Sequence, residues 1–141
     1  MSAVITLARP TAIGPVQTVG GRRASHAASF TTRWGRSGGL VTVRGEVDAA
    51  NADQLVDHLQ RAACYEWVVA DLAMVEFMST SGIVAMHLIN ARFADVDMRW
   101  AVVPGRVVSR LLDVCDPGTR LPIRKSLTVA LASVQKLPAG R

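Results

Sequence analysis

After residue 28, the spacing of hydrophobic residues switches several times between short β-type runs and the period of about 3.6 residues typical of helices. Short runs rich in β-branched and aromatic residues, bounded by glycine, proline or polar clusters, predict strands. These runs fall at 29–34, 40–44, 67–72, 98–103 and 121–123. Apolar residues at helical spacing predict helices over about 52–63, 81–94, 107–112 and 127–134. The result is a chain in which strands and helices alternate.

Three glycines within 35–39 favour a hairpin between the first two strands. An opening hairpin followed by alternating strands and helices predicts a single α/β domain. We expect a mixed sheet of four or five strands with helices packed against it.

Turn and capping residues mark the ends of several elements. Asn51 precedes the first helix as a candidate N-cap, with Gln54 three positions later in a loose capping-box pattern. Asp71 is expected to end the central strand as a turn or capping residue. Pro104 stops the strand over 98–103, and Ser126 is the expected cap of the last helix.

The first 27 residues carry prolines and glycines without a sustained apolar period. This composition predicts a flexible basic N-terminal arm, followed by the folded domain at 28–141. Within the arm, residues 3–7 are a candidate for an extra edge strand.

The helix over 81–94 is apolar nearly all the way round. Its less apolar stripe contains His87 and Asn90, with Ile83 and Ala94 beside them. Such a helix must be covered on most of its surface. We expect Ile83 to be the apolar residue that the core needs least.

Three consecutive hydroxyl residues, Ser79, Thr80 and Ser81, fall where that helix should begin. The free N–H groups and the dipole at a helix start favour negative charge. The local pattern supports two interpretations. One hydroxyl group is simply the N-cap, or one of them accepts a phosphate that would repel or reshape a docked partner.

Four short motifs follow one another in a recognisable order. They are Gly45-Glu-Val-Asp48, then Asp71-Leu72 with Val75 and Phe77-Met-Ser-Thr-Ser-Gly82, then Ala101-Val-Val-Pro104, and finally Val107-Val-Ser-Arg-Leu-Leu-Asp113. Over about 28–137 the chain resembles the STAS domain of bacterial anti-sigma-factor antagonists. One position departs from the family pattern, because Ser79 stands where the family carries Asp before its phosphoacceptor. The acceptor position itself is Thr80 rather than Ser.

The resemblance implies a STAS-like fold and a role in protein binding rather than catalysis. The implied partner is an anti-sigma factor of the serine-kinase class. Unmodified antagonist binds the kinase and so frees a sigma factor, whereas phosphorylated antagonist lets go until a phosphatase restores it. Thr80 is the first candidate for the phosphoacceptor, followed by Ser81 and Ser79.

The partner-binding surface is expected where the loop after the second strand meets the hydroxyl segment, with Ile83 as its apolar centre. Its predicted members are Asp48, Asn51, Ser79, Thr80, Ser81, Gly82 and Ile83. Because Ser79 replaces the family Asp, a second hypothesis is a constitutive STAS scaffold in a multi-protein sensing complex, bound to other STAS proteins. A third is a regulatory subunit of a membrane transporter.

The formal net charge of +5 invites a nucleic-acid interpretation. Three of the 16 Lys and Arg residues lie in the arm, at positions 9, 22 and 23, and none of the 11 acidic residues does. The domain is therefore nearly balanced and lacks an obvious basic stripe for a phosphate backbone. We expect no direct binding of nucleic acid.

Other function classes find little support in the sequence. No apolar run approaches the ~18 residues that span a membrane, and two cysteines are too few for a disulfide framework. A reduced, cytoplasmic protein without membrane insertion is expected. The histidines show no ligand spacing, and no nucleophile motif or phosphate loop occurs, so we expect no metal, no cofactor and no enzymatic activity. His87 is expected to be a helix-surface or interface histidine.

Overall fold

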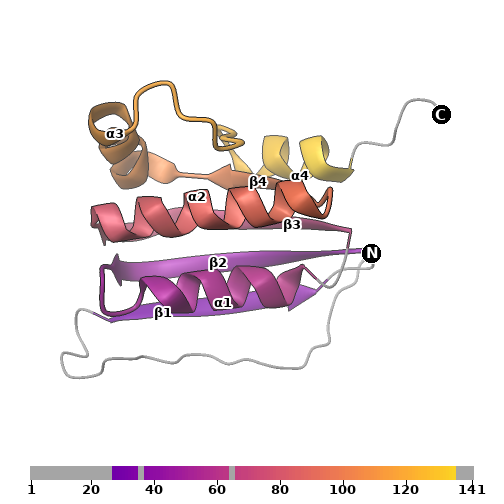
Figure 1. Ribbon diagram of the computed structural model, residues 1–141, viewed down its shortest axis with the longest axis horizontal. Coiled ribbons are helices and arrows are strands. Elements are labelled where there is room, and N and C mark those ends of the chain that lie inside the picture. Colours follow the sequence, from indigo (N-terminus) through magenta and orange to yellow (C-terminus); the bar gives the residue numbers. More distant parts are fainter. Residues whose placement is uncertain (1–26, 35–36, 64–65, 136–141) are drawn as a thin grey trace.

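The computed structural model describes residues 27–34, 37–63 and 66–135. The predicted arm and its candidate strand at 3–7 lie outside the described residues. The elements, in chain order, are β1 (Ala28–Trp34), β2 (Gly38–Val47), α1 (Ala52–Ala62), β3 (Trp67–Met78), α2 (Thr80–Asp95), β4 (Arg99–Val103), α3 (Gly105–Cys115) and α4 (Leu127–Gln135) (Figure 1).

The four strands form one sheet in the order β1-β2-β3-β4. β1 pairs with β2 in antiparallel orientation, which confirms the predicted hairpin, whereas β2, β3 and β4 run parallel. The strand expected at 121–123 is reduced to a single parallel bridge between Val102 and Ile123. The fold is therefore the predicted α/β domain, with a mixed sheet of four strands.

The central strand β3 is longer than predicted, because it continues past Leu72 to Met78. Asp71 does not end it: its Oδ1 accepts a hydrogen bond from the Ala73 N–H at 3.1 Å while the strand continues. The last pair with β4 is Asp71 with Val103, so the second half of β3 pairs only with β2. There the buried positions are only Val75 and Met78. That spacing is not the period of two by which half-buried strands are recognised.

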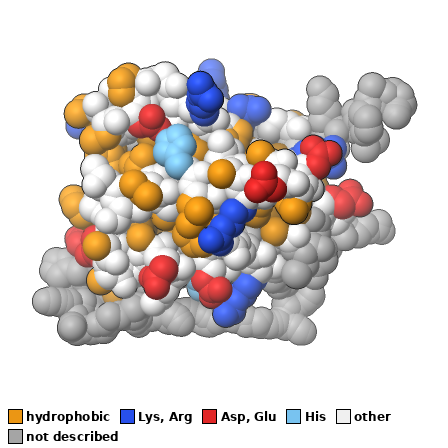
Figure 2. Space-filling view, in the orientation of Figure 1, with side chains coloured by type: hydrophobic (Ala, Val, Ile, Leu, Met, Phe, Trp, Pro, Cys, Tyr) orange, Lys and Arg blue, Asp and Glu red, His pale blue; other side chains and the backbone are white. Residues whose placement is uncertain are grey.

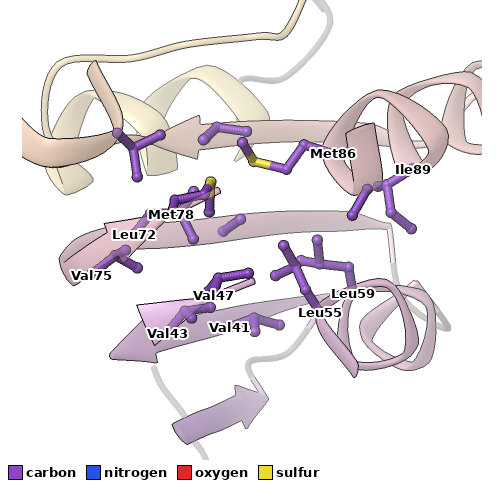
Figure 3. Packing of buried hydrophobic residues seen from close by; sticks show 14 of the residues in the cluster. Val41, Val43, Val47, Leu55, Leu59, Leu72, Val75, Met78, Met86 and Ile89 are labelled. Carbon is purple, nitrogen blue, oxygen red and sulfur yellow. The ribbon is translucent and has the colours of Figure 1, made fainter. Parts of the chain in front are cut away.

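Most of the core lies between the sheet and the helices α1 and α2. Buried side chains of β2 and β3 point toward those of both helices, as Figure 3 shows for Val41, Val43, Val47, Leu55, Leu59, Leu72, Val75, Met78, Met86 and Ile89. Val108 and Leu112 of α3 join the same cluster. The helical spacing of apolar residues that predicted α1 is reflected in its burial, since Leu55, Leu59 and Ala62 are all buried.

The opposite face of the sheet is covered by α4. A separate cluster contains Trp67, Val69, Ala101, Val103, Ala130 and Val134. The predicted cap of this helix is confirmed by the hydrogen bond that Ser126 Oγ accepts from the Val129 N–H at 3.2 Å. Pro104 ends β4 as predicted, and α3 begins immediately afterwards at Gly105.

Candidate functional site

The carboxyl ends of β2 and β3 lie side by side at one end of the sheet, at the left of Figure 1. Val47 pairs with Met78, and the Ser79 N–H donates to the Val47 carbonyl at 2.9 Å. This hydrogen bond joins the residue after β3 to the end of β2. The loop that begins at Asp48 and the start of α2 are therefore neighbours, as the sequence predicted.

Ser79 is the N-cap of α2. It has extended backbone angles, and its Oγ accepts a hydrogen bond from the Ser81 N–H at 3.2 Å. The Ser79 carbonyl accepts from the Gly82 N–H at 2.9 Å. Ser79 and Ser81 are half-buried, whereas Thr80 is exposed. Of the three hydroxyl residues, Ser79 accepts the hydrogen bond that caps the helix, and Thr80 is exposed to solvent.

The electrostatics of this helix start favour an anion. The first turn of α2 contains no acidic residue, so no carboxylate of the helix itself neutralises the positive end of its dipole. A phosphate carries about two negative charges and strong acceptor oxygens. A phosphate on Thr80 would lie beside backbone N–H groups of the first turn.

Gly82 contributes through close packing. A Cβ atom added to it would lie 2.6 Å from Met78 Cγ and 2.8 Å from Met78 Sδ. The absence of a side chain therefore allows α2 to begin directly against the end of β3. Gly82 is buried, so it shapes the site without offering a side chain to a partner.

The turn from Asp48 to Asn51 is held by its own hydrogen bonds. Asn51 Oδ1 accepts from the Asp48 N–H at 3.0 Å, and Asn51 Nδ2 donates to the Glu46 carbonyl at 2.9 Å. The Asp48 Oδ1 accepts from the Ala50 N–H at 2.9 Å. Asn51 precedes α1 as predicted but makes no side-chain capping bond, and it is only 4% exposed. Asn51 braces the turn, and the half-buried Asp48 is more accessible.

The expectation that Ile83 is spare to the core is wrong. Ile83 is 6% exposed and belongs to the main core cluster. The exposed apolar residues of this helix are instead Val84 at 66% and Leu88 at 42%. Both follow Thr80 at intervals of four residues, so the three side chains share one face of α2. Because nearly every position of this helix is apolar, its hydrophobic pattern did not reveal which face is buried.

His87 does not approach the hydroxyl segment but binds another part of the chain. Its Nε2 lies 2.7 Å from Asp116 Oδ2, which joins α2 to the connector between α3 and α4, residues 116–126. A hydrogen bond from Thr119, with a further one from His87, lowers the pKa of the Asp116 carboxyl. The predicted helix-surface position of His87 is confirmed, and its partner was not foreseen because Asp116 is remote in sequence.

In the part of the chain that the structure describes, no three or more His, Cys, Asp and Glu side chains gather closely enough to hold a metal ion. No helix there has the length and apolar character needed to cross a bilayer.

Comparisons with known proteins agree with this architecture. The family model of the STAS domain matches residues 35–130. Osmosensory protein A of Mycobacterium tuberculosis is 32% identical over 97 residues, which cover 65% of this chain and 61% of that protein. The chain therefore spans about three fifths of the length of that relative.

Two solved structures share the fold at low sequence identity. An anti-sigma factor antagonist from Mycobacterium paratuberculosis has a TM-score of 0.70 at 21% identity, covering 79% of this chain and 97% of that one. The anti-sigma factor antagonist SpoIIAA in its unphosphorylated form has a TM-score of 0.61 at 16% identity, covering 77% and 97%. Since the family model spans well over half of the chain, the protein belongs to the STAS-domain family.

Proposed function

We propose that this protein is an anti-sigma-factor antagonist that acts in the cytoplasm. It binds an anti-sigma factor of the serine-kinase class, frees a sigma factor, and is released by phosphorylation at the start of α2. The observation that carries this proposal is that Thr80, the first residue of that helix, is exposed. The shared fold with two anti-sigma factor antagonists supports the same role.

Thr80 is the preferred phosphoacceptor for a geometric reason. A kinase must reach the hydroxyl oxygen from solvent, and Thr80 is the exposed member of the three hydroxyl residues. Ser79 Oγ is already used as the acceptor for the Ser81 N–H. Phosphorylation of Ser79 would disturb this cap, whereas phosphorylation of Thr80 leaves it in place.

The docking surface that we propose runs along α2 from Thr80 through Val84 to Leu88. Figure 2 shows apolar side chains on this face of the molecule, over the first half of α2. Interfaces concentrate their energy in a few desolvated anchors, and an exposed Val and Leu one turn apart suit that role. A phosphate at the end of this apolar stripe would have to be desolvated on docking, which disfavours the complex.

Phosphorylation is tested with the full chain, its cognate anti-sigma kinase, ATP and magnesium, followed by mass spectrometry. We expect one phosphate on Thr80. Thr80→Ala should abolish incorporation, and Ser81→Ala should retain it. Thr80→Ala should also keep the domain folded, because the cap is made by Ser79. Full incorporation into Thr80→Ala would refute the assignment of the acceptor.

Docking is tested by measuring the affinity for the same kinase. Val84→Asp should weaken binding by about 2 kcal/mol or more, which is roughly 30-fold, with an unchanged thermal melt. Val129→Asp is the matched control, because Val129 is 42% exposed near the start of α4, on the opposite face of the sheet. Equal weakening by both substitutions would contradict a surface on α2. A phosphatase that removes the phosphate from Thr80 is the expected third component of the system.

The position of Ser79 favours a second candidate, in which the domain binds constitutively within a sensing or transporter complex. The family Asp is replaced by a residue whose oxygen is used as a cap, so no carboxylate stands before Thr80. The similarity to a relative named osmosensory protein fits a sensing role. Absence of phosphorylation by the cognate kinase, together with recovery of other STAS proteins or a permease in a pull-down, would favour this candidate.

A further inference from the structure

A cavity of about 360 Å³ lies beside β4, at the end of the sheet opposite to the start of α2. It is bounded by the second half of α2, the first residues of β4, the connector after α3, and α4. The side chains that matter here are Asn90, Arg99, Trp100, Arg120 and Arg124. Four separate segments of the chain thus converge on one concave surface.

Three arginines converge on this cavity from two segments that are remote in sequence. Arg99 begins β4, whereas Arg120 and Arg124 belong to the connector. Among the described residues that line the cavity there is no carboxylate. Glu66 lies outside this lining, with its Oε1 4.0 Å from Arg99 Nη2, and both side chains are exposed. Figure 2 shows blue side chains along the upper edge of the molecule, over this connector.

The connector is held against β4 by backbone hydrogen bonds. The Val102 N–H donates to the Pro122 carbonyl at 2.9 Å, and the Arg124 N–H donates to the Val102 carbonyl at 2.8 Å. Arg124 Nη1 also donates to the Ile123 carbonyl at 2.8 Å. The connector arginines are therefore attached to a segment that is fixed to the sheet, which limits the conformational entropy that a ligand must remove.

Asn90 adds a neutral donor to the cavity wall. Its Oδ1 accepts a hydrogen bond from Trp100 Nε1 at 2.9 Å, and Trp100 is only 7% exposed. Because the carbonyl oxygen is used by the indole, the amide nitrogen of Asn90 is the part that remains for a ligand. An amide N–H donor next to guanidinium groups suits an anion with several acceptor oxygens.

We propose that this cavity, defined by Asn90, Arg99, Arg120 and Arg124, binds a small phosphate-bearing anion. The domain as a whole is nearly balanced in charge, so three arginines around one concavity are a local concentration of positive charge that attracts a polyanion. Guanidinium groups match phosphate oxygens in paired geometry. The volume lies near the lower end of the range for small-molecule sites, about 300–1,000 Å³, which favours a small molecule.

Calorimetric titration of the full chain with inorganic pyrophosphate tests this proposal, with malonate as a dicarboxylate comparison at equal ionic strength. We expect saturable binding of pyrophosphate that is tighter than that of malonate. The double substitution of Arg120→Gln and Arg124→Gln should weaken binding by about tenfold or more, as expected for the loss of charged hydrogen bonds. Arg110→Gln on the exposed side of α3 removes the same charge elsewhere and should change affinity by less than about twofold.

A nitrogen–proton NMR spectrum adds a local readout. The Trp100 indole N–H signal should shift on addition of pyrophosphate, since its acceptor Asn90 lines the cavity. Tighter binding of ADP than of pyrophosphate would identify a nucleotide as the ligand, and equal binding a free polyphosphate; both outcomes support the site. No saturable binding at about 1 mM, or equal weakening by Arg110→Gln, would overturn it. This result is independent of the proposed docking surface on α2.

Discussion

Two adjacent residues of α2 allow a sharp test of how this helix faces the core. Ile83 is 6% exposed and Val84 is 66% exposed, although both are β-branched aliphatic residues in the first turns of the same helix. Ile83→Ala removes buried methyl and methylene groups and leaves a cavity, which costs about 3 kcal/mol within a usual range of roughly 2–5. Val84→Ala removes mostly hydrated surface, and its effect should stay within about 0.5 kcal/mol.

These free energies translate into different melting temperatures. At roughly 4 °C per kcal/mol for a domain of this size, Ile83→Ala should melt about 12 °C below the wild type. Val84→Ala should melt within about 2 °C of it, helped by the higher helix propensity of alanine. Circular dichroism at 222 nm follows both melts, and urea titrations give the free energies of unfolding. A larger loss for Val84→Ala than for Ile83→Ala would refute the orientation of α2.

Four further substitutions test other parts of the structure by thermal or urea unfolding. Gly105→Ala should lower the free energy of unfolding strongly, because the residue has a φ of 74° and an added Cβ would lie 2.5 Å from a backbone atom of β3. Gly118→Ala is its control, because Gly118 has a φ of 73° but open space around it, and the substitution should cost only about 1–2 kcal/mol. Burial lowers the pKa of His58 below 6.5, so the free energy of unfolding should fall as pH drops from about 7.5 to about 5.5, and His58→Phe should remove that part of the fall. The Thr119 hydrogen bond lowers the pKa of Asp116 below 3.8, so this stabilisation is present above pH 3.8 and lost on further acidification, and Asp116→Asn should abolish that loss.

The order and type of the four helices and of the four sheet strands could be predicted from local sequence, whereas the strand expected at 121–123 is only a bridge. The glycine-rich sequence over 35–39 predicted the hairpin of β1 and β2. Pro104 ends a strand and Ser126 caps a helix, and both act through their immediate backbone neighbours. The end of β3 could not be predicted in the same way. It is set by pairing with β2, which continues to Val47 with Met78 after β4 has stopped pairing, and this is a property of the assembled sheet.

The candidate site was predictable only in part. The helix start at Ser79 to Ser81 follows from consecutive polar residues before an apolar helix, and the structure confirms Ser79 as its cap. The burial of Ile83 and the exposure of Val84 depend on which side of an almost wholly apolar helix meets the sheet. The spacing of Thr80, Val84 and Leu88 was present in the sequence but could not be distinguished from the buried stripes. The arginine-lined cavity joins segments that only the fold brings together.

The two apolar clusters on opposite faces of the sheet give the protein two regions of unequal cooperativity. On its face, α4 is anchored mainly by Ala130 and Val134, so its amide protons should exchange with solvent through local openings that leave α1 and α2 folded. Trp67 lies in the α4 cluster and Trp100 in the main one. In variants that keep only one of these indoles, with Trp34 also replaced, fluorescence of Trp67 should report detachment of α4, while fluorescence of Trp100 follows global unfolding.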